Sequence, residues 1–566
     1  MKRNESPPDS CKDSMPIEVP KNKNLLPSEF SNRHDTYIAI ALAFVVLVVG
    51  IWQMIVGVCG TFHDDAIYVS TAKAIAQGQG YRLINLPNAP VQTKYPFLYP
   101  AILAVIWRLF PSFPDNLLAM QGLSLLAGSM TIAFAYLYLV RFGYCSRSCA
   151  LASCLFCTFA PYFIYFSTQT LSEIPFAVLF ILSGWILERH LKEPFEKRSS
   201  QLLLGIFLAT PFLCRTIGGI VVPVALIILL FNRRPIIWVT VGSLAGTLPW
   251  ILWVLIHVGG TSQDASAIYY TDYLAWWSSH GLASITRVIC LNLLMILASG
   301  VEVGLAGFSK ALSVLSLGPK LTIKLLPGLL ILIVMYSDLR RARVLPCMMA
   351  GYLLVVCMWP WPPYRFTLPI MPFFLAYMLR GMSRILRSFS SLPAYRGIVL
   401  LVVGGLMVSN LALLNRYSQI KHLTHFPSNG IAGSQVSWSS YKKVFTWIAE
   451  HTEPDDVIAS GFDTMIYLYT GRKAIRPFVV RPTAMFYGEE EEILGSLKNL
   501  EQFFSIYNPR YLVHTPMPLF SEERPFAELI ERAISKTPAL LTPVYVGEDN
   551  RFVIFQIRLA SGIDTY

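Results

Sequence analysis

The sequence predicts an α-helical membrane protein with about 11 transmembrane helices, interfacial helices in its outer loops, and a small C-terminal α/β domain outside the cytoplasm. Only 14% of the 566 residues are charged and 54% are hydrophobic, whereas a soluble domain carries about a quarter charged residues. Long apolar runs recur along most of the chain. The net charge of +12 fits lysines and arginines gathered in cytoplasmic loops, and no basic stripe with interleaved aromatic residues indicates nucleic-acid binding.

The N-terminal region predicts a tail followed by a first span. Residues 1–36 are polar and proline-rich, which is typical of a disordered cytoplasmic tail. The apolar run 37–58 is too long for the core of a signal peptide and has no small-residue cleavage site nearby, so we interpret it as a signal anchor. Further spans are predicted at 116–140, 148–167, 174–190, 236–256, 344–360 and 395–415, with the less apolar 200–213, 216–231, 322–336 and 366–380.

Two more apolar stretches, 97–110 and 286–306, are placed by the positive-inside rule. If either crossed the bilayer, the basic clusters would fall on both sides; if both lie along the outer surface, every cluster is cytoplasmic. The clusters are Arg141/Arg147, Arg189/Lys192/Lys197/Arg198, Arg233/Arg234, Arg340/Arg341/Arg343 and Arg380/Arg384/Arg387. The N-terminus is then cytoplasmic, residues 37–415 form the transmembrane domain, and residues 416–566 lie outside.

Residues 416–566 alternate helical and strand patterns, which predicts the small α/β domain. Helices are expected at 438–450, 489–505 and 522–536, and strands at 455–461, 510–513, 541–546 and 551–557. The segment has no GxGxxG, P-loop or GxSxG motif. We therefore expect a lid or an acceptor-docking module rather than a catalytic domain.

The polar residues of the membrane part gather at the predicted outer rim, beginning with HDDAIYVSTAKAIAQGQG at 63–80. Asp64 and Asp65 start a predicted short helix, where an aspartate is also a favourable N-cap. Two acids in succession, with no further carboxylate through residue 114, are less simply explained as caps. We predict that Asp64 is a catalytic carboxylate and that Asp65 is its partner or a divalent-metal ligand. Tyr68, one turn later, lines a sugar pocket or joins an aromatic belt.

Five more residues are predicted on the same side. Glu173 begins a span in the sequence SEIP, either as a second acid of the site or as a complement to the helix dipole. Arg215 and Arg365 lie at the outer ends of spans, where they grip a phosphate or snorkel to lipid headgroups. Lys94 and Tyr95 precede the apolar second half of the first outer loop and are predicted to bind substrate.

Charge concentrated at the rim favours an enzyme acting on a lipid-linked headgroup over a secondary transporter, because transporters place ionisable groups near the midplane. One carboxylate would take the proton of an acceptor hydroxyl or amine, while the cations stabilise a phosphate leaving group. The competing hypotheses are a transporter or flippase of a lipid-linked glycan, and a membrane scaffold whose α/β domain binds a partner. No cofactor is specified, and a divalent metal ion stays an open alternative.

Four segments resemble the GT-C glycosyltransferases, in the polyprenyl-phosphate-sugar branch that includes protein O-mannosyltransferases and lipid A aminoarabinose transferases. They are HDDAIYVSTAKAIAQGQGY at 63–81, YPFLYPAILAVIWRLF at 95–110, TLSEIPF at 170–176 and YRFTLPIMP at 364–372. The resemblance implies a GT-C fold in a bacterial inner membrane. It implies an inverting transferase that moves a sugar from a polyprenyl-phosphate donor to a lipid, glycan or protein acceptor outside the cytoplasm. Asp64 would be the catalytic carboxylate, Glu173 a second acid, and Arg365 a neighbour of the lipid phosphate.

Overall fold

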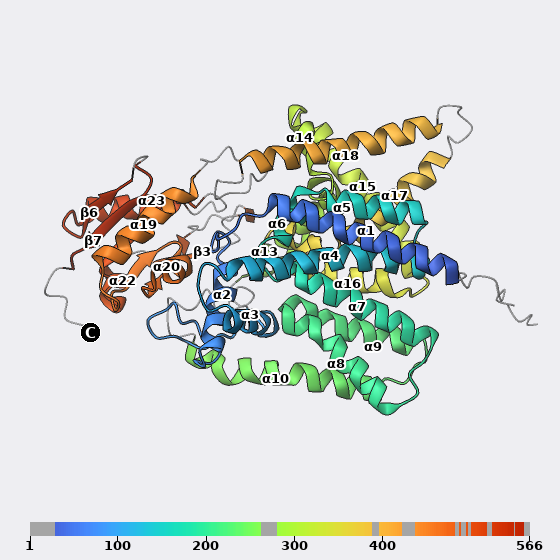
Figure 1. The fold of residues 1–566 in the computed structure, drawn as a ribbon, viewed down its shortest axis with the longest axis horizontal. Helices are drawn as coiled ribbons and strands as arrows, with labels where there is room; N and C mark the ends of the chain where they lie inside the picture. The colour runs from blue at the N-terminus through green and yellow to red at the C-terminus, as the bar shows by residue number, and fades with distance from the viewer. Residues whose placement is uncertain are drawn as a thin grey trace, which may run out of the picture.

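The computed structural model describes residues 29–261, 280–387, 395–420, 436–480, 486–487, 494–495, 500–517, 523–547 and 550–559. Long helices form a bundle, and an α/β domain built from the C-terminal residues lies at one end of it (Figure 1). Two short helices of the first outer loop, α2 (Asp64–Ala76) and α3 (Leu98–Leu109), lie at this same end.

The bundle is built from helices that follow the predicted spans closely. Its first part comprises α1 (Glu29–Gln53), α4 (Leu117–Arg141), α5 (Arg147–Thr158), α6 (Pro161–Ser167), α7 (Glu173–Lys192), α8 (Arg198–Cys214), η1 (Thr216–Ile220), α9 (Val221–Phe231) and α10 (Ile237–Thr261). Its second part comprises α13 (Leu282–Glu302), α14 (Ala306–Ala311), η2 (Leu312–Val314), α15 (Leu317–Leu339), α16 (Val344–Met358), η3 (Arg365–Ile370), α17 (Met371–Arg387) and α18 (Tyr395–Gln419).

Seven helices of the described residues are long and apolar enough to cross a membrane, or eight if α5 and α6, which meet at 67°, form one broken span. The apolar helices α8, α9 and α16 are shorter. The chain is therefore an integral membrane protein, while the total of 11 crossings stays a prediction. The helix α3, predicted to lie along the surface, has 12 residues, too few to cross, and its Arg108 donates to the Ala76 carbonyl at the end of α2 at 3.2 Å.

The second stretch predicted to lie along the surface, α13, is long enough to cross, so its position along the surface stays a prediction. The side-chain amide of Asn292 donates to the carbonyl of Trp359, just after α16, at 2.7 Å. A Cβ on Gly304, just after α13, would lie 2.8 Å from Leu375 near the start of α17. The middle of α13 therefore lies beside the turn that follows α16, while its C-terminal end packs against α17.

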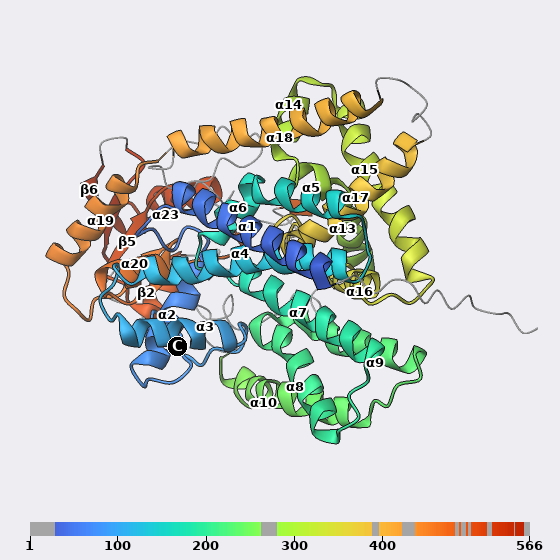
Figure 2. The same ribbon diagram turned by 45° about the vertical axis from the view of Figure 1, so that its right-hand side comes forward.

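The helices α8, α9 and α10 lie together on one side of the bundle in both ribbon views (Figure 2). Small residues allow α8 and α10 to approach closely, as in other membrane helix pairs. A Cβ on Gly205 would lie 2.1 Å from the Val239 carbonyl oxygen, and one on Gly242 would lie 2.0 Å from that of Leu202. The helix α8 ends at Cys214, and Arg215 follows it directly.

The end of the bundle away from the α/β domain gathers arginines that were predicted to be cytoplasmic. Arg343 donates to the carbonyl of Phe142, after α4, at 2.7 Å. Arg147 forms an ion pair with Asp35 of α1 at 2.7 Å. The clusters that precede α5 and α16 therefore lie at one face, as the positive-inside argument requires.

One boundary in the N-terminal region was predicted too late. The helix α1 begins at Glu29, inside the segment 1–36 expected to be a disordered tail. The reason is that Asp35 is buried and satisfied: it pairs with Arg147 and accepts a hydrogen bond from the Tyr136 hydroxyl at 3.4 Å. A charge that finds such partners can extend an apolar helix. The remainder of the expected tail, 1–28, lies outside the described residues.

The C-terminal domain contains a five-stranded sheet in the order β2-β1-β5-β7-β6. The strands are β1 (Ile458–Ser460), β2 (Ala474–Ile475), β5 (Tyr511–His514), β6 (Leu541–Val546) and β7 (Val553–Ile557), with a separate antiparallel pair of β3 (Val479–Val480) and β4 (Leu494–Gly495). The helices are α19 (Trp438–His451), α20 (Asp463–Thr470), α22 (Leu500–Tyr507) and α23 (Glu523–Lys536). β1 runs parallel to β2 and β5, and β7 runs antiparallel to β5 and β6.

The predicted α/β character of this domain is confirmed. The helix α19 and the strands β1, β5, β6 and β7 lie where the sequence pattern placed them. Most of the expected helix 489–505 lies outside the described residues, and its described part is α22. The helix α20 and the strand β2, whose residues contact the first outer loop, were not predicted from the sequence.

Candidate active site

Asp64 stands in the first turn of α2, at the end of the bundle that carries the α/β domain. The preceding residue, His63, has a φ of 60°, which is uncommon for a residue other than glycine and is often found at functional sites. The Asp64 side chain is buried, and its Oδ1 accepts a hydrogen bond of 2.6 Å from the Tyr95 hydroxyl. Its Oδ2 pairs with Nη2 of Arg365.

Arg365 connects the two acids of the site. It begins η3, in the proline-rich turn between α16 and α17, and its Nε lies 2.9 Å from Oε1 of Glu173 while Nη2 contacts Asp64. One planar guanidinium thus bridges two carboxylates that come from different helices. The side chain is 26% exposed, so it remains accessible from one side.

Glu173 lies between two arginines at the start of α7. The same Oε1 that approaches Arg365 lies 2.8 Å from Nη1 of Arg215, which follows α8. Arg215 Nη1 also donates to the hydroxyl of Ser172 at 2.9 Å, and that hydroxyl lies 2.8 Å from the Tyr68 hydroxyl. Ser172 therefore connects Tyr68 of α2 with Arg215 through its hydroxyl group.

The charges of this cluster shift the pKa of its members. Burial alone would raise the pKa of Asp64, but the ion pair with Arg365, the hydrogen bond from Tyr95 and the nearby Lys94 together hold it below the ordinary value of 3.8. Burial lowers the pKa of Arg365, yet Glu173 and Asp64 outweigh burial and raise it. Both groups are therefore charged at neutral pH.

Aromatic rings surround the charges. The Tyr68 ring meets Tyr95 edge-on at a centroid distance of 5.3 Å and Tyr99 at 5.1 Å. The Phe366 ring lies 5.4 Å from the guanidinium carbon of each arginine, Arg215 and Arg365. Such rings exclude water from a charged cluster and add cation–π attraction.

Asp65, although adjacent in sequence, is placed apart from this cluster. It is fully buried, and its two oxygens accept the backbone amides of Gly60 at 2.6 Å and Phe62 at 3.1 Å. Burial raises its pKa to about 6, because desolvation outweighs these amide hydrogen bonds. Successive residues of a helix point about 100° apart, so Asp64 faces Arg365 while Asp65 faces the loop before α2.

The residues present do not fit the divalent metal ion considered for Asp64 and Asp65. The oxygens of Asp64 are taken by Tyr95 and Arg365, and those of Asp65 by backbone amides. Within the described part of the chain, no group of three or more His, Cys, Asp or Glu side chains is arranged to hold a metal ion.

The structure brings together seven of the eight site residues predicted from the sequence: Asp64, Tyr68, Lys94, Tyr95, Glu173, Arg215 and Arg365. Ser172 and Phe366 also belong to the cluster but were not predicted from the sequence, although both lie within the motifs that carry the predicted residues. Their position in the sequence could have indicated them, because each is directly adjacent to a predicted site residue.

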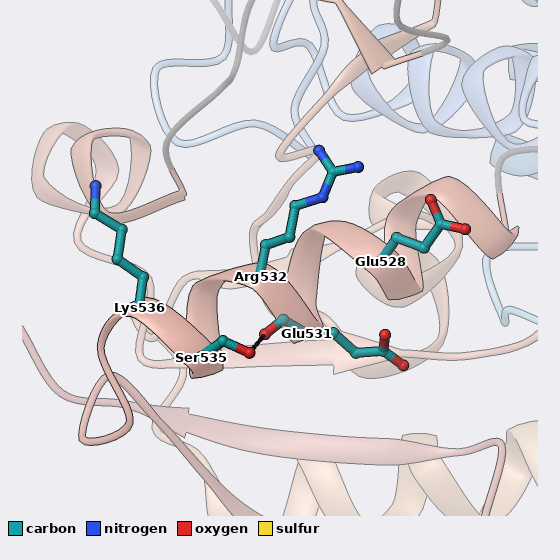
Figure 3. A pocket seen from close by; sticks show the side chains of 5 residues that line it. All are labelled: Glu528, Glu531, Arg532, Ser535 and Lys536. Carbon is teal, nitrogen blue, oxygen red and sulfur yellow. Dashed lines mark hydrogen bonds between the residues drawn. The ribbon is translucent and has the colours of Figure 1, made fainter.

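A hollow elsewhere in the described residues lies on the C-terminal domain (Figure 3). Its lining comes from the single helix α23 and consists of Glu528, Glu531, Arg532, Ser535 and Lys536. The charges are mixed in sign, and Ser535 donates to the carbonyl of Glu531 at 2.8 Å. This is the polar face of an amphipathic surface helix, and we assign it no function.

Comparison with known proteins gives likeness in sequence over part of the chain and in fold over most of it. Residues 94–256 match the family described as dolichyl-phosphate-mannose-protein mannosyltransferase. No curated protein sequence matches the chain. The structure of ArnT from Cupriavidus metallidurans bound to undecaprenyl phosphate is similar with a TM-score of 0.51 at 14% identity, over 92% of this chain and 97% of that chain.

A second similar structure is the archaeal oligosaccharyltransferase AglB from Archaeoglobus fulgidus, in complex with an inhibitory peptide and a dolichol-phosphate. Its TM-score is 0.50 at 12% identity, over 91% of this chain and 74% of that chain. Another Archaeoglobus fulgidus oligosaccharyltransferase structure, a complex with Zn and sulfate, has a TM-score of 0.53 at 13% identity, over 90% and 72%. The chain therefore has the GT-C fold, and the resemblance to GT-C glycosyltransferases is confirmed.

Proposed function

We propose that this protein is a membrane glycosyltransferase that moves a sugar from a polyprenyl-phosphate donor to an acceptor outside the cytoplasm, with inversion at the sugar carbon. The observation that supports it most is the chain of ion pairs Asp64–Arg365–Glu173–Arg215. Its members come from four segments far apart in sequence. They meet at one end of the bundle, beside the helices of the first outer loop.

The two guanidiniums are suited to hold the donor phosphate. Arg215 and Arg365 share Glu173 as partner and Phe366 as a ring neighbour, and Lys94 lies near enough to influence Asp64. The donor is a phosphodiester with one negative charge, and the lipid phosphate that leaves carries a second. The arginines therefore stabilise the transition state more than the ground state, which is what accelerates a reaction.

Asp64 is assigned as the general base. Its carboxylate takes the proton from the acceptor hydroxyl or amine as that atom attacks the anomeric carbon. The bond from this carbon to the phosphate oxygen breaks on the opposite face, and its electron pair leaves with the lipid phosphate. A single displacement of this kind inverts the anomeric configuration.

The ion pair of Asp64 with Arg365 suggests how donor binding prepares the base. A phosphate that binds Arg365 competes with the Asp64 carboxylate for the same guanidinium. Once Arg365 turns to the phosphate, Asp64 loses its strongest counter-charge, so its pKa rises and it becomes a better proton acceptor. Glu173 keeps contact with both arginines and acts as a positioning residue.

The partners and location follow from the same proposal. The donor is a polyprenyl-phosphate-linked sugar, and the acceptor is a lipid, glycan or protein. Membrane lipids surround the helical bundle. ArnT and AglB, which share the fold, have been solved with undecaprenyl phosphate and with dolichol-phosphate. We propose a bacterial inner membrane, with the N-terminus cytoplasmic and the α/β domain outside.

The proposal is tested with the full-length protein in nanodiscs and a panel of undecaprenyl-phosphate sugars. Mass spectrometry should detect undecaprenyl phosphate released together with a glycosylated or hydrolysed product. A fluorescent undecaprenyl-phosphate sugar in proteoliposomes serves as the second arm. Translocation of this lipid without any glycosidic bond formed or cleaved would replace the transferase with a flippase.

A further inference from the structure

We propose that the C-terminal domain is a positioning element of the active site, in which helix α20 holds the two chain segments that deliver Asp64 and its partner Tyr95. The inference rests on the proposed function and extends it, because the domain would then serve every turnover rather than only acceptor docking. Two sets of contacts, one on each segment, carry it.

The first set holds the loop that leads into α2. The Tyr469 hydroxyl, in α20, donates to the Gly57 carbonyl at 2.8 Å and accepts the Cys59 amide at 3.1 Å. The next amides of this loop, at Gly60 and Phe62, donate to Asp65. Tyr469 therefore fixes the incoming loop, and Asp65 connects that loop to the first turn of α2.

The packing around this loop leaves little freedom. Gly60 has a φ of 103°, which favours glycine, and a Cβ there would lie 2.7 Å from Met465 of α20. The ring of His63, the residue before Asp64, lies 5.0 Å from that of Phe462, which precedes α20. The loop thus packs against the C-terminal domain at Gly60 and at His63.

The second set holds the segment that leads to Tyr95. The side-chain amide of Asn85 is buried and donates to Asp463 at 3.3 Å and to Thr464 at 3.2 Å, both in the first turn of α20. The Asn85 carbonyl accepts the amide of Ala474 in β2 at 2.9 Å. Lys473, beside it, donates to the Pro87 carbonyl at 2.7 Å.

These two sets converge on one carboxylate. The segment after residue 57 presents Asp64, and the segment after residue 87 presents the Tyr95 hydroxyl that binds it at 2.6 Å. Because the domain grips both segments, a small shift of α20 would move the base and its hydrogen-bond donor relative to the arginines. Misplacement of a reacting group by about 1 Å can reduce the rate about a hundredfold.

The test compares Tyr469→Phe with Tyr467→Phe in the full-length protein in nanodiscs. Both changes remove one hydroxyl from α20, but the Tyr467 ring lies over the ammonium of Lys73 at 4.6 Å, whereas the Tyr469 hydroxyl makes the hydrogen bonds with the 57–62 loop. Hydrogen exchange followed by mass spectrometry should show peptides covering 57–62 exchanging at least about threefold faster in Tyr469→Phe alone. Equal exchange in the two variants would overturn the proposal.

Turnover of the donor provides the second readout. With an undecaprenyl-phosphate sugar that the wild type uses, Tyr469→Phe should lower kcat about tenfold and leave the KM for the donor within about twofold. An effect on the KM for the acceptor alone would contradict the positioning role and favour acceptor docking. The exchange measurement needs no substrate, so a failure of the transferase proposal would not be mistaken for a failure of this one.

Discussion

The carboxylate of Asp64 and the guanidinium of Arg365 form an ion pair although 301 positions separate them in the chain. Each group is therefore held by the other before any substrate arrives. The same guanidinium also contacts Glu173, whose carboxylate in turn contacts Arg215. Under the proposed function, a donor phosphate that enters this site competes with Asp64 for Arg365 and frees that carboxylate to act as the base.

Replacing Arg365 by lysine should remove most of the activity although the charge is kept. A lysine ammonium is a single point of charge and cannot bridge Asp64 and Glu173 as the planar guanidinium does. We expect kcat/KM for the donor to fall about a hundredfold and undecaprenyl phosphate to bind at least about tenfold more weakly. Arg82→Lys is the control, because that exposed arginine of the first outer loop donates to the Ala89 carbonyl, at 3.1 Å. Equal behaviour of the two variants would contradict the assignment.

Replacing Glu173 by glutamine should separate binding from turnover. The change removes the negative charge between Arg215 and Arg365, so the two guanidiniums attract an anion more strongly. Undecaprenyl phosphate should bind about threefold to tenfold more tightly, while kcat falls because the arginines lose their common partner. The two values are measured by titration in nanodiscs and by donor turnover. Weaker binding in Glu173→Gln would show that the carboxylate does not compete with the phosphate.

Tyr95→Phe should make activity more sensitive to acid. The Tyr95 hydroxyl stabilises the ionised form of Asp64, so its removal raises the pKa of that carboxyl. The ratio of kcat/KM at pH 5 to that at pH 7 should therefore be lower in the variant than in the wild type. A hydrogen bond to a charged group is worth about 1.5 to 3 kcal/mol, which corresponds to about one to two pKa units. An unchanged ratio would argue against Asp64 as the base.

Asp65 should make the protein less stable as the pH rises. Its pKa is raised from 3.8 to about 6 in the folded state, so its stabilising contribution is complete below 3.8 and is lost as the pH rises through 6. Above that window the buried carboxylate costs about 3 kcal/mol relative to its protonated form. Thermal unfolding at pH 5 and pH 8 should show a larger drop in Tm for the wild type than for Asp65→Asn. Parallel drops would mean that Asp65 does not titrate in this window.

Most of the helical layout could be predicted from the sequence, because apolar runs and basic clusters are local features that can be recognised in each segment separately. The span at α7 and the strand β6 lie almost where the pattern placed them. The start of α1 could not be predicted in this way, because the helix extends to Glu29 only where Asp35 meets Arg147, a partner far along the chain.

For the site, too, the local features could be predicted from the sequence and the contacts between distant residues could not. Local patterns singled out Asp64, Glu173 and Arg365 as charges at the ends of predicted helices, and the structure brings them together. Adjacency in sequence did not reveal that Asp65 faces the other way, since this depends on which amides the loop before α2 presents. The contacts of α20 with that loop join residues about 400 positions apart, for example Tyr469 with Gly57, and no local pattern reports them.

The most direct test is the turnover of an undecaprenyl-phosphate sugar by Asp64→Asn, measured beside Asp115→Asn in nanodiscs. Asp115 is an exposed acid of the same outer loop, bonded to Ser112 at 3.2 Å. We expect Asp64→Asn to lose about 10²- to 10⁴-fold in kcat, the contribution of a general base, while it still binds undecaprenyl phosphate and Asp115→Asn keeps wild-type turnover. Release of lipid phosphate by Asp64→Asn at the rate of the wild type would contradict the account.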